Sequence, residues 1–228
     1  VNNNCGSNCI SKNSAISDSS NGLNYNQIIT KYSTDSTVNN AKEDSYANNI
    51  TYASGGYSNV IVYRQVDYEQ PFCHLSGTSI HYYGCGITSM AMVLSTFVDN
   101  SITPLVVNED AYNEKACDRS GTYARLFKIE ADKYNLGYQH VNKFGNLQIV
   151  INALQKGKSL VIVNVGPGTF ITGGGHYMVI SKINTKGEVY VIDPFKAQDS
   201  STFKDGWYSF NDVIVKDSKS GFYIISKG

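Results

Sequence analysis

The chain has 228 residues, enough for one domain with a sizeable core and an added segment. Its hydrophobic content of 41% is typical of a globular protein, and no apolar run reaches the about 18 to 20 residues that a membrane helix needs. The 19 acidic and 19 basic residues leave no net charge, so the chain lacks the basic field that attracts nucleic acid or an anionic surface. We therefore expect no nucleic-acid partner and no membrane span.

The first part of the chain differs in composition from the rest. Asn, Ser, Asp and Thr dominate residues 1–55, which read as a linker or N-terminal extension. The rough helical spacing of a few apolar residues predicts one short helix there, formed by Leu23, Tyr25, Ile28, Ile29 and Tyr32. We place the boundary at Gly55-Gly56 and expect a folded domain over 56–228.

The start of the chain and its composition bear on its origin. It begins at Val1 and carries no signal peptide, so we expect a module of a larger multidomain chain. The richness in Asn, Ser, Thr and Tyr suggests a secreted or surface protein of a bacterium.

Hydrophobic spacing predicts the elements of the folded domain in chain order. We expect a short strand over 60–63, a loop over 71–83 and an amphipathic helix beginning close to Cys85. Further helices are predicted over 111–116, 122–134 and 147–155, and further strands over 160–165, 177–183, 188–192, 207–210 and 221–225. Gly187 marks a hairpin turn between two of these strands. Helices followed by strands predict an α+β domain, with a helical half packed on an antiparallel sheet.

Cys85 is the first candidate for chemistry. It lies between Gly84 and Gly86 at the start of the predicted helix. The positive end of a helix favours the thiolate, which is the nucleophilic form of cysteine, and flanking glycines allow a substrate backbone to approach. The alternative is a buried structural cysteine between turn glycines.

His176 and Asp193 are the candidate partners of Cys85. His176 follows Gly174 and Gly175, at the end of a glycine-rich segment over 166–175 that is a candidate wall or lid of a cleft, and precedes a strongly apolar strand. Asp193 ends the next strand, where it can orient the imidazole. His74 and His81 lie in the loop before Cys85 and are alternatives that can also reach it, whereas His140 lies in a polar stretch between two predicted helices and is less suitable. A surface histidine and an ordinary strand-end aspartate are the alternatives.

Cysteine, histidine and carboxylate in this order form the layout of a thiol nucleophile, its base and the group that orients the base. The blocks Gly-Cys-Gly-x-Thr-Ser-x-Ala-Met-Val-Leu, Gly-His-Tyr-Met-Val-Ile and Tyr-Val-Ile-Asp-Pro resemble those of papain-like cysteine peptidases related to bacteriocin-leader-processing (double-glycine) peptidases. They are also similar to NlpC-type cell-wall endopeptidases. The resemblance covers roughly residues 60–226. It implies a papain-like fold with Cys85 as nucleophile, His176 as general base and acid, and Asp193 as the orienting residue.

The same resemblance implies a glutamine upstream of the cysteine that donates a hydrogen bond to the oxyanion. We assign this role to Gln65, with Gln70 in reserve. The segment from Gln65 to Cys85 is longer than in compact relatives, so an inserted loop has to fold away for Gln65 to reach the site.

Five cysteines constrain the redox chemistry. An odd number leaves at least one free thiol in an exported protein, and Cys85 is the natural candidate. Cys5 and Cys9 can bridge each other or pair with an upstream domain, and metal binding by them is disfavoured because no second pair at finger spacing follows. Cys73 and Cys117 can pair, although the sequence does not establish that geometry. We expect neither metal nor cofactor.

The expected activity is amide hydrolysis through a thioester acyl-enzyme. Double-glycine leader peptidases are fused to transporters and nothing here spans a membrane, so the peptide cross-links of a bacterial cell wall are the expected substrate. The alternatives are a protein- or propeptide-processing protease, a transferase that uses the same acyl-enzyme, and a non-catalytic surface module for binding or adhesion in which the tyrosines and Trp207 form a binding face.

Overall fold

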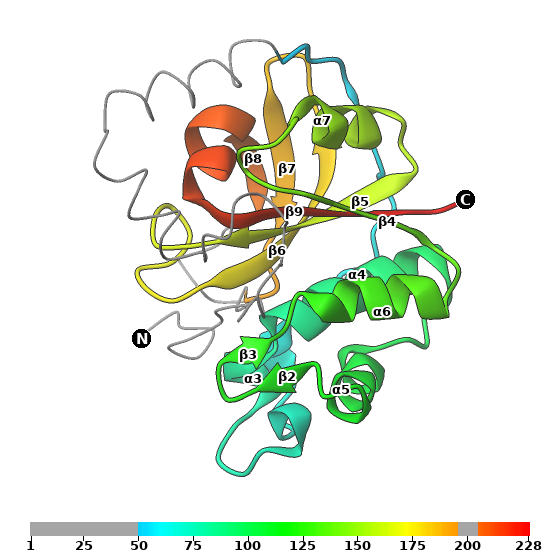
Figure 1. Ribbon diagram of the computed structural model, residues 1–228, viewed down its shortest axis with the longest axis vertical. Coiled ribbons are helices and arrows are strands. Elements are labelled where there is room, and N and C mark those ends of the chain that lie inside the picture. The colour runs from blue at the N-terminus through cyan, green and yellow to red at the C-terminus, as the bar shows by residue number, and fades with distance from the viewer. Residues whose placement is uncertain (1–49, 196–204) are drawn as a thin grey trace, which may run out of the picture.

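The computed structural model describes residues 50–195 and 205–228 (Figure 1). Its main sheet has seven antiparallel strands, six of them in the order β4-β9-β5-β6-β7-β8, with β1 pairing β6. The strands of this sheet are β1 (Gly55–Gly56), β4 (Gly137–Val141), β5 (Ser159–Val165), β6 (His176–Ile183), β7 (Glu188–Ile192), β8 (Gly206–Ser209) and β9 (Ser218–Ser226). A separate small hairpin pairs β2 (Cys117–Asp118) with β3 (Gly121–Thr122).

Helices pack on both faces of the main sheet (Figure 1). The α-helices are α3 (Ile80–Tyr83), α4 (Cys85–Phe97), α5 (Pro104–Asn113), α6 (Arg125–Lys133) and α7 (Gln148–Gln155). Shorter turns of helix are η1 (Gln65–Asp67), η2 (Phe72–His74) and η3 (Phe210–Val215). Helices α4 and α6 contact one face, α5 packs on α4, and α7 and η3 contact the other face. The predicted α+β class is therefore confirmed.

The central strand β5 is buried along its whole length, which explains its apolar run from Leu160 to Val163. Alternate side chains of a strand point to opposite faces of the sheet. Leu160 and Ile162 accordingly belong to the core on the α4 side, and Val161 and Val163 to the core on the α7 side. One strand thus contributes to two cores.

Most predicted elements are present, with shifted ends. The helix expected near Cys85 is α4, and the predicted hairpin joins β6 to β7 with Gly187 at a φ of 77°. The helix expected over 111–116 is only partly correct, because α5 begins at Pro104, whose missing N–H is not needed in the first turn, and ends at Asn113.

Several assignments differ from the prediction. The segment expected as a loop over 71–83 contains η2 and α3, and the small hairpin of β2 and β3 was not predicted. The strand expected over 60–63 is wrong: the backbone N–H of Ile61 donates to Oγ1 of Thr96 in α4 (2.9 Å), so this segment lies along the helix and outside the sheet. Strand β4, which contains His140, was missed because it lies at an edge of the sheet and only its last residue is fully buried. The helix predicted around Leu23 lies outside the described residues.

In the described part of the chain, no helix has the length and apolar character needed to cross a membrane.

Candidate active site

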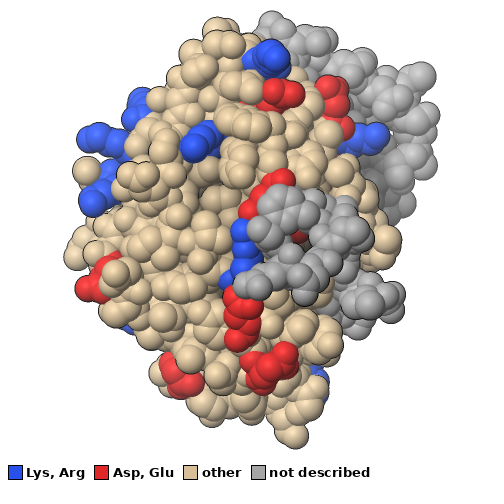
Figure 2. All heavy atoms as spheres, turned by 180° about the vertical axis from the view of Figure 1, so that it is seen from behind, with Lys and Arg blue, Asp and Glu red and all other residues tan. Residues whose placement is uncertain are grey.

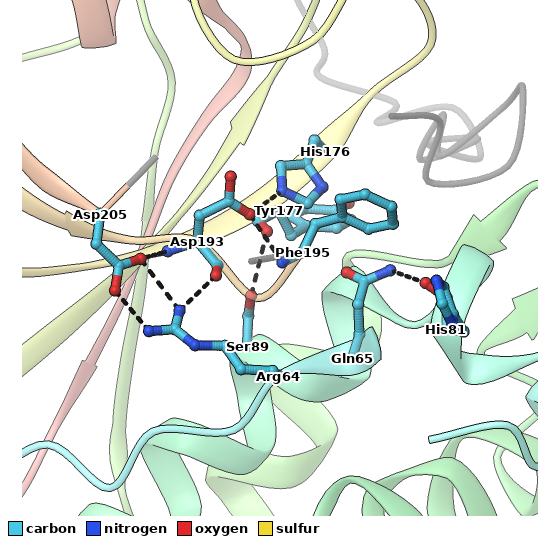
Figure 3. A network of polar contacts seen from close by, with 9 residues as sticks. All are labelled: Arg64, Gln65, His81, Ser89, His176, Tyr177, Asp193, Phe195 and Asp205. Carbon is cyan, nitrogen blue, oxygen red and sulfur yellow. Dashed lines mark hydrogen bonds and ion pairs between the residues drawn. The ribbon is translucent and has the colours of Figure 1, made fainter. Parts of the chain in front are cut away.

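His176 and Asp193 form a buried pair at one end of the sheet (Figure 3). His176 is the first residue of β6, and Asp193 directly follows β7, the antiparallel neighbour of β6. Nε2 of His176 lies 2.7 Å from Oδ1 of Asp193, and the two side chains are only 2% and 6% exposed. The backbone N–H of Phe195 donates to the same carboxylate oxygen (2.9 Å), which fixes the carboxylate in place.

The charges around Asp193 keep it ionised. Burial acts to raise the pKa of Asp193. This effect is outweighed by the attraction of His176, by the hydrogen bonds from His176 and the Phe195 N–H, and by the nearby Arg64 guanidinium. The pKa of Asp193 therefore lies below its usual value. An ionised carboxylate accepts a hydrogen bond, so Nε2 of His176 carries a proton. Nδ1 of His176 has no hydrogen-bond partner among the described residues and is the ring nitrogen left to exchange a proton.

The helix that begins at Cys85 lies against this pair. Cys85 is fully buried as the first residue of α4. Ser89 lies one turn later on the same side of α4, and its hydroxyl donates to the carbonyl oxygen of Tyr177 (3.3 Å), the residue after His176 (Figure 3). The fold therefore brings the first turn of α4 to the start of β6, as the assigned roles of Cys85 and His176 require.

Cys85 is disulfide-bonded in this structure. The expectation of a free thiol at Cys85 is thus wrong for this state, because its sulfur is part of a disulfide. A sulfur in a disulfide is not a nucleophile, so catalysis by Cys85 requires prior reduction of this bond.

Gln65 lies beside the segment that leads into α4. It is fully buried as the first residue of η1, and its Nε2 donates to the carbonyl oxygen of His81 (2.7 Å; Figure 3). This hydrogen bond orients the amide and leaves the second Nε2 hydrogen available. Gln70, the reserve candidate, has an exposed side chain. The geometry thus favours Gln65 for the donor role.

The loop between Gln65 and Cys85 folds away from the site. The backbone N–H of His81 donates to the carbonyl of Tyr68 (2.8 Å), and that of Ile80 to the carbonyl of Gln70 (2.9 Å). These bonds close the base of the insertion, so its length does not separate Gln65 from α4.

The inserted loop is also anchored at its tip. A disulfide joins Cys73 to Cys117 with the Cα atoms 6.4 Å apart, which realises the pairing that the sequence left open. The side chain of Asn108 in α5 adds two hydrogen bonds, accepting from the Cys73 N–H (2.8 Å) and donating to the Pro71 carbonyl (3.2 Å).

The glycines around Cys85 have packing reasons. Both are buried, and a Cβ at Gly84 would lie 2.5 Å from Cγ2 of Ile80, while one at Gly86 would lie 2.5 Å from Cβ of Thr122. Their predicted part in substrate approach stays a prediction, as does that of Gly174 and Gly175, which precede β6.

The other histidines have different surroundings. His74 pairs with the exposed Glu109, the ring of His81 pairs with Glu69, and the ring of His140 stacks on Tyr223. Of the histidines in the described part of the chain, His176 is the one that bonds a buried carboxylate.

Sequence reasoning missed two charged residues of the site, Arg64 and Asp205, which form an ion pair beside Asp193 (Figure 3). The position of Arg64 directly before Gln65 was the available signal. Nothing in the sequence marked Asp205.

A buried histidine–aspartate pair beside a helix that begins with a cysteine, in an α+β domain, is the arrangement of a papain-like cysteine peptidase. Residues 57–215 match the model of the Peptidase_C39 like family, so the chain belongs to this family and is a cysteine-type peptidase. The solved structure of xylellain, a cysteine protease from Xylella fastidiosa, is similar with a TM-score of 0.48 and 10% identity, covering 78% of this chain and 98% of that chain. No curated protein matches the chain.

Proposed function

We propose that this peptidase cleaves the peptide cross-links of bacterial cell walls through a thioester on Cys85. The observation that carries the catalytic assignment is the buried His176–Asp193 hydrogen bond of 2.7 Å, placed beside the first turn of α4.

The reaction begins once Cys85 is reduced. The Cys85 thiol gives its proton to Nδ1 of His176. The resulting thiolate attacks the substrate carbonyl, and a C–S bond forms as the carbonyl oxygen becomes an oxyanion. The Cys85 backbone N–H and the second Nε2 hydrogen of Gln65 donate to that oxyanion. Protonated His176 gives its Nδ1 proton to the leaving nitrogen, and the C–N bond breaks.

Water then releases the product. His176 accepts a proton at Nδ1 from the attacking water, the C–S bond breaks, and the carboxylic acid leaves. Asp193 holds the Nε2–H throughout and stabilises the imidazolium, because its carboxylate stays ionised.

Two features support a substrate outside the cell. The Cys73–Cys117 disulfide is of a kind that persists in oxidising compartments. The Asn-, Ser- and Thr-rich segment over 1–55 suits a surface or secreted protein that carries further domains. We therefore propose that the enzyme acts on the bacterial surface or in the medium.

The surface charge is compatible with a neutral peptide substrate. The net charge is zero, and the face shown in Figure 2 carries both acidic and basic side chains. Long-range attraction of a highly charged partner is therefore not built into this surface.

The test is digestion of purified bacterial cell walls by the chain after treatment with a reductant. We expect new amino termini from cross-link peptides, identified by mass spectrometry, and a loss of turbidity. Cys85→Ala is the control and abolishes both. Intact walls together with cleavage of a protein such as casein would refute the cell-wall substrate and favour a protein-processing protease.

A further inference from the structure

We infer that the Arg64–Asp205 ion pair is a positioning device that holds the orienting carboxylate, Asp193, in register with the oxyanion donor, Gln65. This inference rests on the proposed function, because it assigns to the pair an effect on the same site.

The ion pair bonds both backbone polar groups of Asp193, its carbonyl oxygen and its N–H (Figure 3). Nη1 of Arg64 donates to the Asp193 carbonyl oxygen (2.6 Å), and Oδ1 of Asp205 accepts from the Asp193 N–H (2.8 Å). Arg64 also binds both carboxylate oxygens of Asp205, through Nη1 at 3.1 Å and Nη2 at 2.5 Å. With its N–H and its C=O both held, the peptide plane on each side of Asp193 is fixed, and so is the direction of its Cα–Cβ bond.

The same contact connects the two halves of the site. Gln65 directly follows Arg64, and its backbone N–H donates to the carbonyl of Pro194 (2.8 Å), the residue after Asp193. Two consecutive residues on the helical side therefore meet two consecutive residues on the sheet side. A shift of Arg64 would move the Gln65 amide and the Asp193 carboxylate relative to each other.

Burial distinguishes this pair from an ordinary surface ion pair. The side chains of Arg64 and Asp205 are 16% and 8% exposed, whereas those of Lys128 and Asp132 in α6 are each 59% exposed. Charges taken out of water incur a desolvation cost, so a buried pair is a weak stabiliser of the fold. The bidentate contact between the guanidinium and the carboxylate instead fixes the orientation of both groups, and a lysine at position 64 does not reproduce it.

The experiment compares Arg64→Lys and Asp205→Asn in the full, reduced chain, with Asp132→Asn as the matched control on the surface. One readout is the rate at which iodoacetamide alkylates Cys85 at pH 6, followed by mass spectrometry of its peptide, which needs no substrate. The other is kcat and KM for release of amino termini from purified cell walls. Near-ultraviolet circular dichroism confirms folding.

A positioning role predicts that Arg64→Lys and Asp205→Asn each lower kcat about 10- to 100-fold with KM nearly unchanged, because displacements of about 1 Å have effects of that size. The alkylation rate of Cys85 falls in both, the double variant is little worse than the worse single variant, and the control is unaffected. Asp205→Asn keeps an oxygen that accepts from the Asp193 N–H but loses the charge that binds Arg64. If Arg64→Lys does not fold, this variant alone tests the inference.

If the folded variants keep both kcat and the alkylation rate of Cys85 within about twofold of the control, the inference is overturned. That outcome is separate from failure of the proposed function, which would appear as cell walls left intact by the reduced wild-type chain, or as cell-wall cleavage that survives Cys85→Ala.

Discussion

Replacing Gln65 with alanine tests whether this residue stabilises the transition state. In the structure the Gln65 amide is buried, and its Nε2 donates to the carbonyl oxygen of His81 at 2.7 Å. This bond fixes the orientation of the amide and leaves the second Nε2 hydrogen for the oxyanion. The substitution removes this donor and leaves the backbone N–H of Cys85 as the remaining donor to the oxyanion.

The expected loss follows from the strength of one oriented donor. Removing a single oxyanion donor typically lowers kcat by about 10²- to 10³-fold, or about 3 to 4 kcal/mol. We expect KM to change little, because the oxyanion exists only in the transition state and the intermediate. The free energy of unfolding should also fall, by about 1 to 3 kcal/mol, because the His81 carbonyl loses its partner.

The assay measures kcat and KM on purified cell walls with reduced enzyme, at a temperature where both proteins are folded. Gln70→Ala is the matched control, because Gln70 has the same side chain but is exposed, and among the described residues it bonds only through its backbone carbonyl, toward Ile80. A Gln65→Ala enzyme that keeps more than a third of the wild-type kcat, or a Gln70→Ala enzyme that loses as much activity, would refute the assignment.

Three further variants test the surroundings of the site. Glu130 is fully buried with neither carboxyl oxygen hydrogen-bonded among the described residues, and burial raises its pKa from 4.5 to about 7. Between pH 4.5 and about 7 the folded state therefore binds more protons than the unfolded state. The free energy of unfolding falls as the pH rises through this range, and it levels off above about pH 7. In urea titrations, the free energy of unfolding of Glu130→Gln should not decline over this pH range, and at pH 8 it should exceed that of the wild type by about 2 to 3 kcal/mol. An equal pH dependence in both proteins would contradict the reasoning. Replacing both Cys73 and Cys117 with serine opens a loop with a sequence separation of 44 and should lower the free energy of unfolding by about 4 kcal/mol, visible in the same titration. Gly86→Ala should lower the melting temperature because its Cβ would lie 2.5 Å from Cβ of Thr122, and an unchanged melting temperature would show that the helix shifts freely.

Local pattern was enough to predict the class of fold and the main parts of the site. The 3.6-residue spacing after Cys85 predicted α4, and the apolar run over 160–165 predicted β5, because each pattern matches the period of the side chains that the element buries. The hairpin signal at Gly187 then placed His176 and Asp193 on paired strands, at the same end of the sheet. These predictions depend on residues close together in the sequence.

Edge elements and loop closure were less predictable. The strand expected over 60–63 failed because its backbone bonds a side chain of α4, and β4 was missed because an edge strand buries too little to show a clear pattern. The insertion between Gln65 and Cys85 closes through backbone hydrogen bonds, which leave no mark in residue type.

The way the helical half meets the sheet was decided only in three dimensions. Arg64 reaches Asp193 across 129 positions of sequence and Asp205 across 141. Such contacts depend on how the sheet packs on α4, and residue spacing carries no information about that docking. The sequence alone therefore named the candidate nucleophile, base and orienting carboxylate, while the tertiary structure showed the disulfide on Cys85 and the ion pair that holds Asp193 beside Gln65.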